Sequence, residues 1–218
     1  MNTNSTNNRY YTEKTYIALE EEGRIAVVDN ESRKLIRIID LSDIQNEKFV
    51  KYSAHNVQVS PDGSKVIATA NVVRGDMGNV AEETENISDE LKDKIFIIDP
   101  LTDTIIGSVL LGIDLHLAHV VMDASGSTAY VNAQEAGKTF VVNLDLQKVT
   151  SIYELGEGSG PHGLRITSDN STLFIALIGG RSVVSIDLKN SDIKKYPLTG
   201  RAVQTAVTPD VFSYVGHH

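Results

Sequence analysis

One turn between two apolar strands recurs four times along the chain, and this repeat limits the possible folds more than any other feature. The first copy is His55–Ser64, whose turn reads Ser-Pro-Asp-Gly. Proline presets the first corner, aspartate bonds back to its own backbone and glycine accepts positive φ. Related turns follow Met122, Ile166 and Val207, at intervals of 63 residues from Val59 and then 44 and 41.

A second landmark recurs between these turns. It is an apolar strand that ends in Asp or Asn, followed by a short polar turn and another strand. Its intervals are 70, 44 and 44 residues. Because the two landmarks alternate, each unit holds four strands, which we call A to D. One interval is long in each series, and a single insertion explains both. The copies are Ile25–Asp29, Ile95–Asp99, Phe140–Asn143 and Val183–Asp187.

A four-stranded antiparallel unit repeated every 40 to 45 residues is typical of β-propeller blades. A β-sandwich also has many short strands, but it does not need the same turn at the same place in every repeat. The sequence therefore predicts an all-β propeller with a repeat of about 42 residues.

The strand count predicts three full blades between two partial ones. A ring of seven blades would need about 300 residues, so we expect an incomplete propeller whose open edge strands invite self-association. The alternative is a small closed ring of four blades, which leaves Thr15–Leu19 without a place. The predicted segments are a disordered tail at 1–13, blades at about 14–50 (strands B, C and D), 51–114, 115–159, 160–200 and 201–218, and a B–C loop insertion at 72–93.

Three segments resemble the blades of the YVTN-type β-propeller repeat family. Ala54–Gly63 and Pro161–Leu164 are similar to the start of its blades, and Ile97–Ile105 is similar to its C-to-D turn. Relatives include surface-layer propellers, the haem-d1 domains of nitrite reductases and copper propeller enzymes. The resemblance implies copper or haem as conceivable cofactors. It also implies a periplasmic or extracellular location, although the chain as given starts without a signal peptide.

Composition narrows the classes of partner. The net charge of −9 disfavours nucleic acid and anionic membranes. The absence of cysteine excludes thiolate metal sites and a cysteine nucleophile. No apolar stretch is long enough for a membrane span. We therefore expect a protein or small-molecule ligand on the channel face.

Histidines gather where the predicted blades begin. His55, His119 and His162 start successive A strands, His116 lies just before His119, and His217 lies in a B–C loop, so all five are expected on one face near the channel mouth. Imidazoles in this arrangement could bind copper or zinc, or hold a haem. Alternatively, each caps its blade by bonding to backbone. His119 is one residue out of register with the aligned positions of His55 and His162, and adjacent strand residues point to opposite faces.

The insertion at 72–93 carries seven acidic and two basic residues. Its acidic residues include Asp76, Glu82, Glu83 and Glu85, which predict a lid or partner loop over the channel mouth. The alternative is a solvated loop. The glycine-rich Gly156–Gly160 precedes a strand and not a helix, so it predicts a blade connection and not a phosphate loop.

Propellers host many chemistries, so the fold does not decide the function. The leading hypothesis is a non-enzymatic binding or scaffold module that presents its channel face to a ligand or protein. The alternative is a copper- or haem-dependent redox enzyme with histidine ligands. A hydrolase with a central calcium ion would need a ring of axial acids, which the sequence does not show.

Overall fold

Short strands joined by tight turns make up the regular secondary structure of this computed structural model, which describes residues 13–74, 90–208 and 213–217. The turns fall where residues tolerate left-handed backbone: Gly63, Gly126 and Asn170 all have positive φ in the predicted A–B turns. Over those residues the structure has no helix, and hence no helical segment with the length and hydropathy to cross a membrane.

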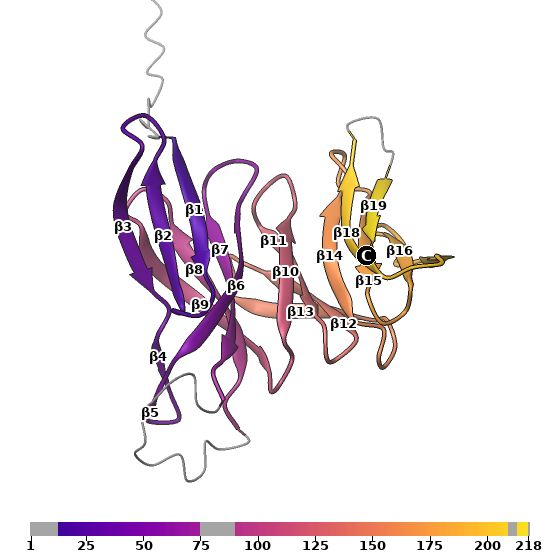
Figure 1. The fold of residues 1–218 in the computed structure, drawn as a ribbon, viewed down its shortest axis with the longest axis horizontal. Helices are drawn as coiled ribbons and strands as arrows, with labels where there is room; N and C mark the ends of the chain where they lie inside the picture. Colours follow the sequence, from indigo (N-terminus) through magenta and orange to yellow (C-terminus); the bar gives the residue numbers. More distant parts are fainter. Residues whose placement is uncertain (1–12, 75–89, 209–212, 218) are drawn as a thin grey trace, which may run out of the picture.

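Three complete antiparallel sheets of four strands follow one another along the chain, and the strand order within each sheet is the chain order (Figure 1). Their first strands, β6, β10 and β14, lie side by side as inner strands. The strands are β6 (Tyr52–Val59), β7 (Val66–Val72), β8 (Asp93–Asp99) and β9 (Thr104–Gly112); β10 (Leu117–Met122), β11 (Thr128–Ala133), β12 (Lys138–Asn143) and β13 (Lys148–Glu154); and β14 (Pro161–Ile166), β15 (Thr172–Leu177), β16 (Ser182–Asp187) and β17 (Ile193–Pro197).

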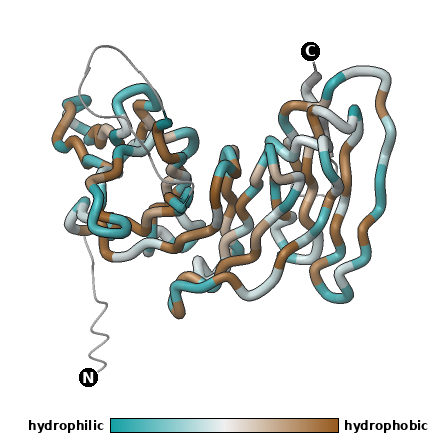
Figure 2. The backbone as a smooth tube through the Cα atoms, turned by 90° about the horizontal axis from the view of Figure 1, so that it is seen from below, coloured by the Kyte–Doolittle hydropathy of each residue, from teal (hydrophilic) through white to brown (hydrophobic). Residues whose placement is uncertain are grey.

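Partial sheets stand at both ends of this series. The first contains β1 (Lys14–Leu19), β2 (Arg24–Asp29) and β3 (Lys34–Asp40), and the last contains β18 (Ala202–Val207) and β19 (Ser213–His217). The sheets form an open arc, with a gap between the first sheet and β18–β19 (Figure 2). The predicted fold class, an incomplete propeller with three full and two partial blades, is confirmed.

A hairpin between the first two sheets was not predicted. It consists of β4 (Asp43–Gln45) and β5 (Lys48–Val50), joined by a two-residue turn with positive φ at both positions. Its base is anchored by an ion pair of 2.5 Å between the Asp43 carboxylate and the buried ammonium of Lys94. The hairpin therefore belongs structurally to the second sheet.

Apolar faces of neighbouring sheets pack on each other and form the core. A separate cluster of buried residues lies between each pair of successive sheets. Among the described side chains, the cluster against β18 is small, with Ala176, Val183 and Ala202 buried. The last partial sheet is therefore held by little apolar contact and by polar contacts of its inner strand.

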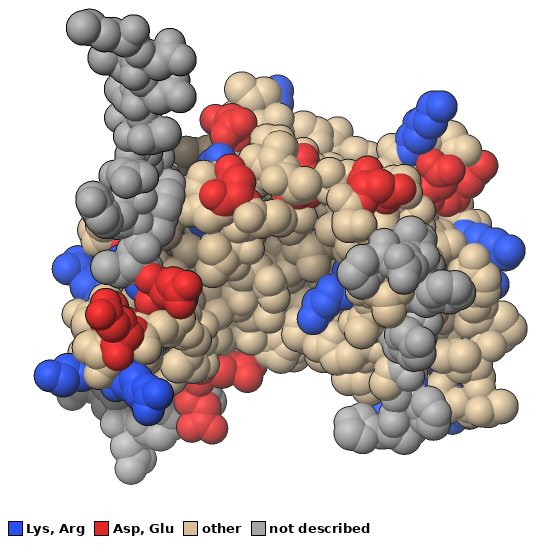
Figure 3. All heavy atoms as spheres, turned by 90° about the horizontal axis from the view of Figure 1, so that it is seen from above, with Lys and Arg blue, Asp and Glu red and all other residues tan. Residues whose placement is uncertain are grey.

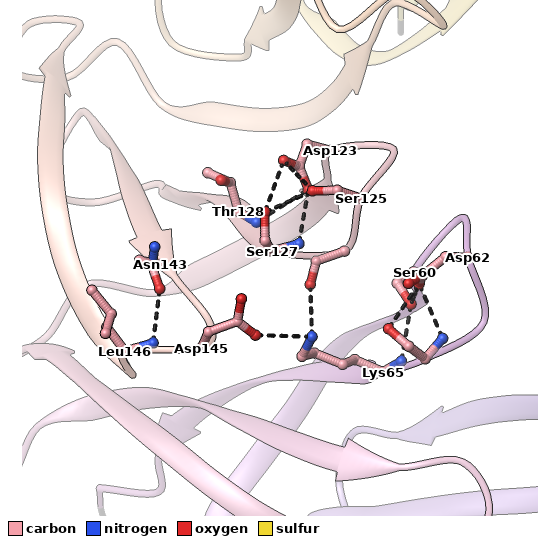
Figure 4. A network of polar contacts seen from close by, with 12 residues as sticks. Ser60, Asp62, Lys65, Asp123, Ser125, Ser127, Thr128, Asn143, Asp145 and Leu146 are labelled. Carbon is pink, nitrogen blue, oxygen red and sulfur yellow. Dashed lines mark hydrogen bonds and ion pairs between the residues drawn. The ribbon is translucent and has the colours of Figure 1, made fainter.

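The Ser-Pro-Asp-Gly turn also links two sheets through polar contacts (Figure 4). Inside the turn, Ser60 Oγ donates to Asp62 at 2.6 Å and accepts from the Lys65 N–H at 2.9 Å. The Lys65 ammonium then reaches the next sheet, where it donates to Gly126 O at 3.1 Å and pairs with Asp145 at 3.2 Å. The repeated turn thus orients the lysine that joins the second sheet to the third.

Close approach of β18 to β14 requires glycine at position 163. A Cβ at Gly163 would lie 2.6 Å from Val203 O and 2.2 Å from Gln204 Oε1. We expect Gly163→Ala to displace β18 and to lower the free energy of unfolding by about 1–3 kcal/mol, measured by chemical denaturation. The control is Gly216→Ala in β19, because an added Cβ there meets nothing within 4 Å. Equal stability of the two variants would contradict this account of β18.

Candidate metal centre on the inner strands

Each inner strand contains a β-bulge, in which two residues face one residue of the neighbouring strand. A bulge interrupts the pleat and re-aims the side chains it contains. His55, His119 and His162 each occupy one of these bulges. The register shifts fall between Ala54 and Val57 in β6, between Leu117 and Val120 in β10, and between Pro161 and Leu164 in β14.

The bulges bring the three histidines together despite the offset of His119 in the sequence. His55 and His162 are the first residues of their bulges and His119 is the second, so strict alternation would place His119 on the other face. Instead, one ring nitrogen from each histidine lies within 4.8 Å of the others. The ring centroids of His119 and His162 are 4.7 Å apart, and those of His55 lie 5.7 and 5.8 Å from them. We call these three residues the histidine triad.

Acceptors on neighbouring blades orient two rings of the triad. The Nδ1 of His55 lies 2.7 Å from Glu20 Oε1, and Glu20 follows β1. The Nδ1 of His162 lies 3.1 Å from Val203 O in β18. A carboxylate and a carbonyl can only accept, so both Nδ1 atoms carry the proton. Nε2 of each ring is therefore the nitrogen with a free lone pair, as a metal ligand requires.

The third ring contacts an amide. Nε2 of Gln204 lies 3.0 Å from Nε2 of His119, while Gln204 Oε1 is buried without a hydrogen-bond partner among the described residues. Turning the amide over would place Oε1 against a protonated Nε2 and leave Nδ1 of His119 with the free lone pair. Gln204 therefore sets the tautomer of His119, and only the turned amide leaves that ring a nitrogen for a metal ion.

Burial lowers the pKa of two of the three triad histidines, His119 and His162. It lowers the pKa of His119 from 6.5 to about 4, with further lowering by His162, His55 and Arg165. Burial also lowers the pKa of His162, against a raising effect of its bond to Val203. These two rings are therefore free bases at pH 7, which is the form that binds a metal. Figure 3 shows a largely uncharged surface in the middle of this view, with both acidic and basic side chains around it.

Buried polar side chains on the second strands support the bulges. Thr69 Oγ1 accepts from the Asn56 N–H at 2.9 Å and donates to Ala118 O at 3.2 Å. In the third sheet, Asn132 donates to His162 O at 2.7 Å and accepts from Thr139 Oγ1 at 2.6 Å. The repeat pattern in the sequence does not mark these residues. The available signal was a polar residue inside a strand that is otherwise buried.

The remaining predicted site residues are not part of the histidine triad. The exposed His116 lies beside the triad, with its ring centroid 5.6 Å from that of His55. His217 ends β19, and its side chain lies outside the described residues, as do Asp76, Glu82, Glu83 and Glu85 of the predicted lid or partner loop.

Asp93, the last acidic residue of the predicted insertion, begins β8 and is buried. Its carboxylate accepts from the backbone N–H groups of Val72 and Leu115, each at 2.8 Å. Asp93 thus joins β7 to the loop that leads into β10 and does not face solvent in an acidic flap.

The spacing of the triad suits a transition-metal ion. A tetrahedral zinc ion bound at about 2.0–2.1 Å to each nitrogen needs nitrogens about 3.4 Å apart. The triad nitrogens lie within 4.8 Å of one another, so the side chains would have to close in on a bound ion. Three protein ligands leave a fourth position for water or another ligand, which is the arrangement of catalytic rather than structural zinc sites.

Comparison with known proteins bears on the fold. No family model and no curated protein matches the sequence. A solved chain of Kuenenia stuttgartiensis hydrazine synthase is similar in structure, with a TM-score of 0.70 and 16% sequence identity over 93% of this chain and 64% of that one. This chain therefore spans less than two thirds of its neighbour. Likeness at this identity supports the propeller fold alone, and the YVTN-type resemblance stays a prediction.

The lowered pKa of His119 predicts a stability change with pH in metal-free protein. Unfolded His119 takes up a proton near pH 6.5 and the folded residue only near pH 4, so the unfolded state binds more protons between these values. Stability should therefore fall as the pH is lowered from 6.5 to 4, with up to about 3 kcal/mol from this residue. Denaturation in chelator at several pH values measures it. His119→Gln should lose that contribution, and an unchanged pH dependence in the variant would refute the assignment.

Proposed function

We propose that this chain is a propeller binding module that holds a transition-metal ion at the mouth of its channel. The ligands are His55, His119 and His162. One observation carries the proposal. Three consecutive blades each place one imidazole nitrogen within 4.8 Å of the other two, although His119 is one residue out of register with His55 and His162 in the repeats.

The donor set favours zinc or copper. Imidazole nitrogen suits Zn, Cu, Ni and Fe, whereas Ca and Mg prefer oxygen ligands. The carboxylate of Glu20 on Nδ1 of His55 and the carbonyl of Val203 on Nδ1 of His162 are the outer partners that ligating histidines commonly have. Such partners fix the ring orientation and raise the basicity of the ligand.

An ion fits the triad better than a haem does. The rings already contact each other edge to face, with centroids 4.7 to 5.8 Å apart. A haem held between two of these rings would need them on opposite faces of its flat macrocycle, and rings in direct contact leave no room for one between any pair. This contact favours a mononuclear metal over the haem alternative.

Both the binding function and the redox alternative would use the open fourth coordination position of the metal ion. A binding module uses that position to hold a ligand or a side chain from a protein partner. A copper enzyme would use it to bring a substrate to a redox-active ion. The two hypotheses share the triad and differ in whether the bound metal changes oxidation state.

Metal titration tests the proposal. Untagged protein is stripped with chelator and titrated with Zn²⁺ and Cu²⁺ by calorimetry, and we expect one ion per chain. His55→Ala and His162→Ala should each weaken binding by at least about tenfold. The control is Thr150→Ala on the outer strand β13, where an exposed hydroxyl donates to Val141 O. It should bind like the unmodified chain.

Two results would decide against the site. Absence of stoichiometric binding by the unmodified protein refutes the proposal outright. Binding that survives in both histidine variants assigns the ion to another place. If Cu²⁺ binds, the visible spectrum of the bound ion is recorded during reduction and reoxidation. A reversible change indicates a redox site, and no change indicates a binding site.

Glu20 supplies a second test, through the orientation of His55. Glu20→Gln keeps the size of the side chain but removes the charge that holds the Nδ1 proton. We expect a metal Kd about 10 to 100 times higher, with the same stoichiometry. Glu22→Gln on the same turn, where Glu22 pairs with Arg24 and not with a histidine, is the control. An unchanged Kd in Glu20→Gln would show that this carboxylate does not tune the site.

A further inference from the structure

His116 has an unusual position for an ordinary surface residue. It lies between β9 and β10, immediately before the first residue of the inner strand. Its backbone is left-handed, with φ of 49°, and its side chain is exposed. This conformation is uncommon for residues other than glycine, although asparagine, aspartate and histidine adopt it more often than the rest. Strain of this kind concentrates at functional positions.

Buried groups hold the backbone of His116 in place. The carboxylate of Asp93 accepts from the N–H of Leu115 at 2.8 Å and also from the N–H of His116. On the other side, the N–H of Gln134 donates to His116 O at 3.0 Å. The loop is therefore fixed while the imidazole remains free to rotate in solvent.

This fixed backbone places the ring beside the triad. The centroid separation between His116 and His55 is 5.6 Å, and His55 is separated from its triad partners by 5.7 and 5.8 Å. His116 is thus as close to His55 as the other ligands are. It differs from them in being exposed and in having no hydrogen bond to its ring among the described contacts.

We infer that His116 is a fourth, exchangeable ligand of the metal ion, an assignment that rests on the proposed triad site. With its imidazole turned inward, the ion has four nitrogen ligands. With it turned outward, the fourth position is open to water or to a ligand from the channel. Three half-buried rings hold the ion, and the exposed ring controls access to it.

The experiment counts nitrogen ligands on Cu²⁺. Electron paramagnetic resonance of the Cu²⁺-loaded chain should show hyperfine coupling to one more imidazole than His116→Asn shows. Asparagine tolerates the left-handed backbone, so the loop is preserved. The Kd of the variant should be about tenfold higher or more, since even an outer-shell partner is worth that much. Asp114→Asn is the control, because Asp114 is also left-handed, with φ of 51°, and should leave the spectrum unchanged.

Each outcome bears on one of the two proposals. If His116→Asn has the same nitrogen count and Kd as the unmodified chain, while His55→Ala loses the metal, His116 is not a ligand and the triad site stands. If the unmodified chain binds no Cu²⁺ stoichiometrically, the triad site itself fails and the assignment of His116 fails with it. A lower nitrogen count in His116→Asn but not in Asp114→Asn supports the exchangeable ligand.

Discussion

Packing of each sheet on the next is the interaction on which the rest of this structure depends. A separate buried cluster fills each space between neighbouring sheets. Because the sheets fan around a common axis, their first strands come side by side there. The candidate metal site is a consequence of this arrangement, since its ligands come from three different sheets and their hydrogen-bond partners Glu20 and Val203 from the two end sheets.

The first sheet stands at the open end of the arc and exposes apolar residues there. Ile17 and Ile38 flank Ala26 across three paired strands, and both isoleucines are about two-fifths exposed, at 43% and 41%. In the third sheet the residue at the position of Ile17 is Val131, which is buried, whereas Ile152, at the position of Ile38, is equally exposed at 41%. Self-association was predicted from the open edge strands of an incomplete ring, and that expectation stays a prediction.

Local departures from the alternating strand pattern, and contacts between sheets, explain why the positions of some side chains could not be predicted from the sequence. Alternation puts His119 on the wrong face, because a bulge is invisible in a one-dimensional pattern. Thr69 and Asn132 look like surface positions until the next sheet buries them against the bulged strands. Asp93 looks like part of an acidic loop, yet it accepts from a backbone N–H of β7 and from one in the loop before β10. All of these depend on contacts between residues far apart in the chain.

By itself, the sequence determined the all-β class, the four-stranded repeat and the start of inner strands at His55, His119 and His162. Turn chemistry and β-branched runs are local properties, so they can be deduced from neighbouring residues. Only the tertiary structure decided that the three imidazoles meet, with His116 beside them. Their distances depend on the angle between sheets and on three bulges, which are set by packing and by buried hydrogen bonds across blades.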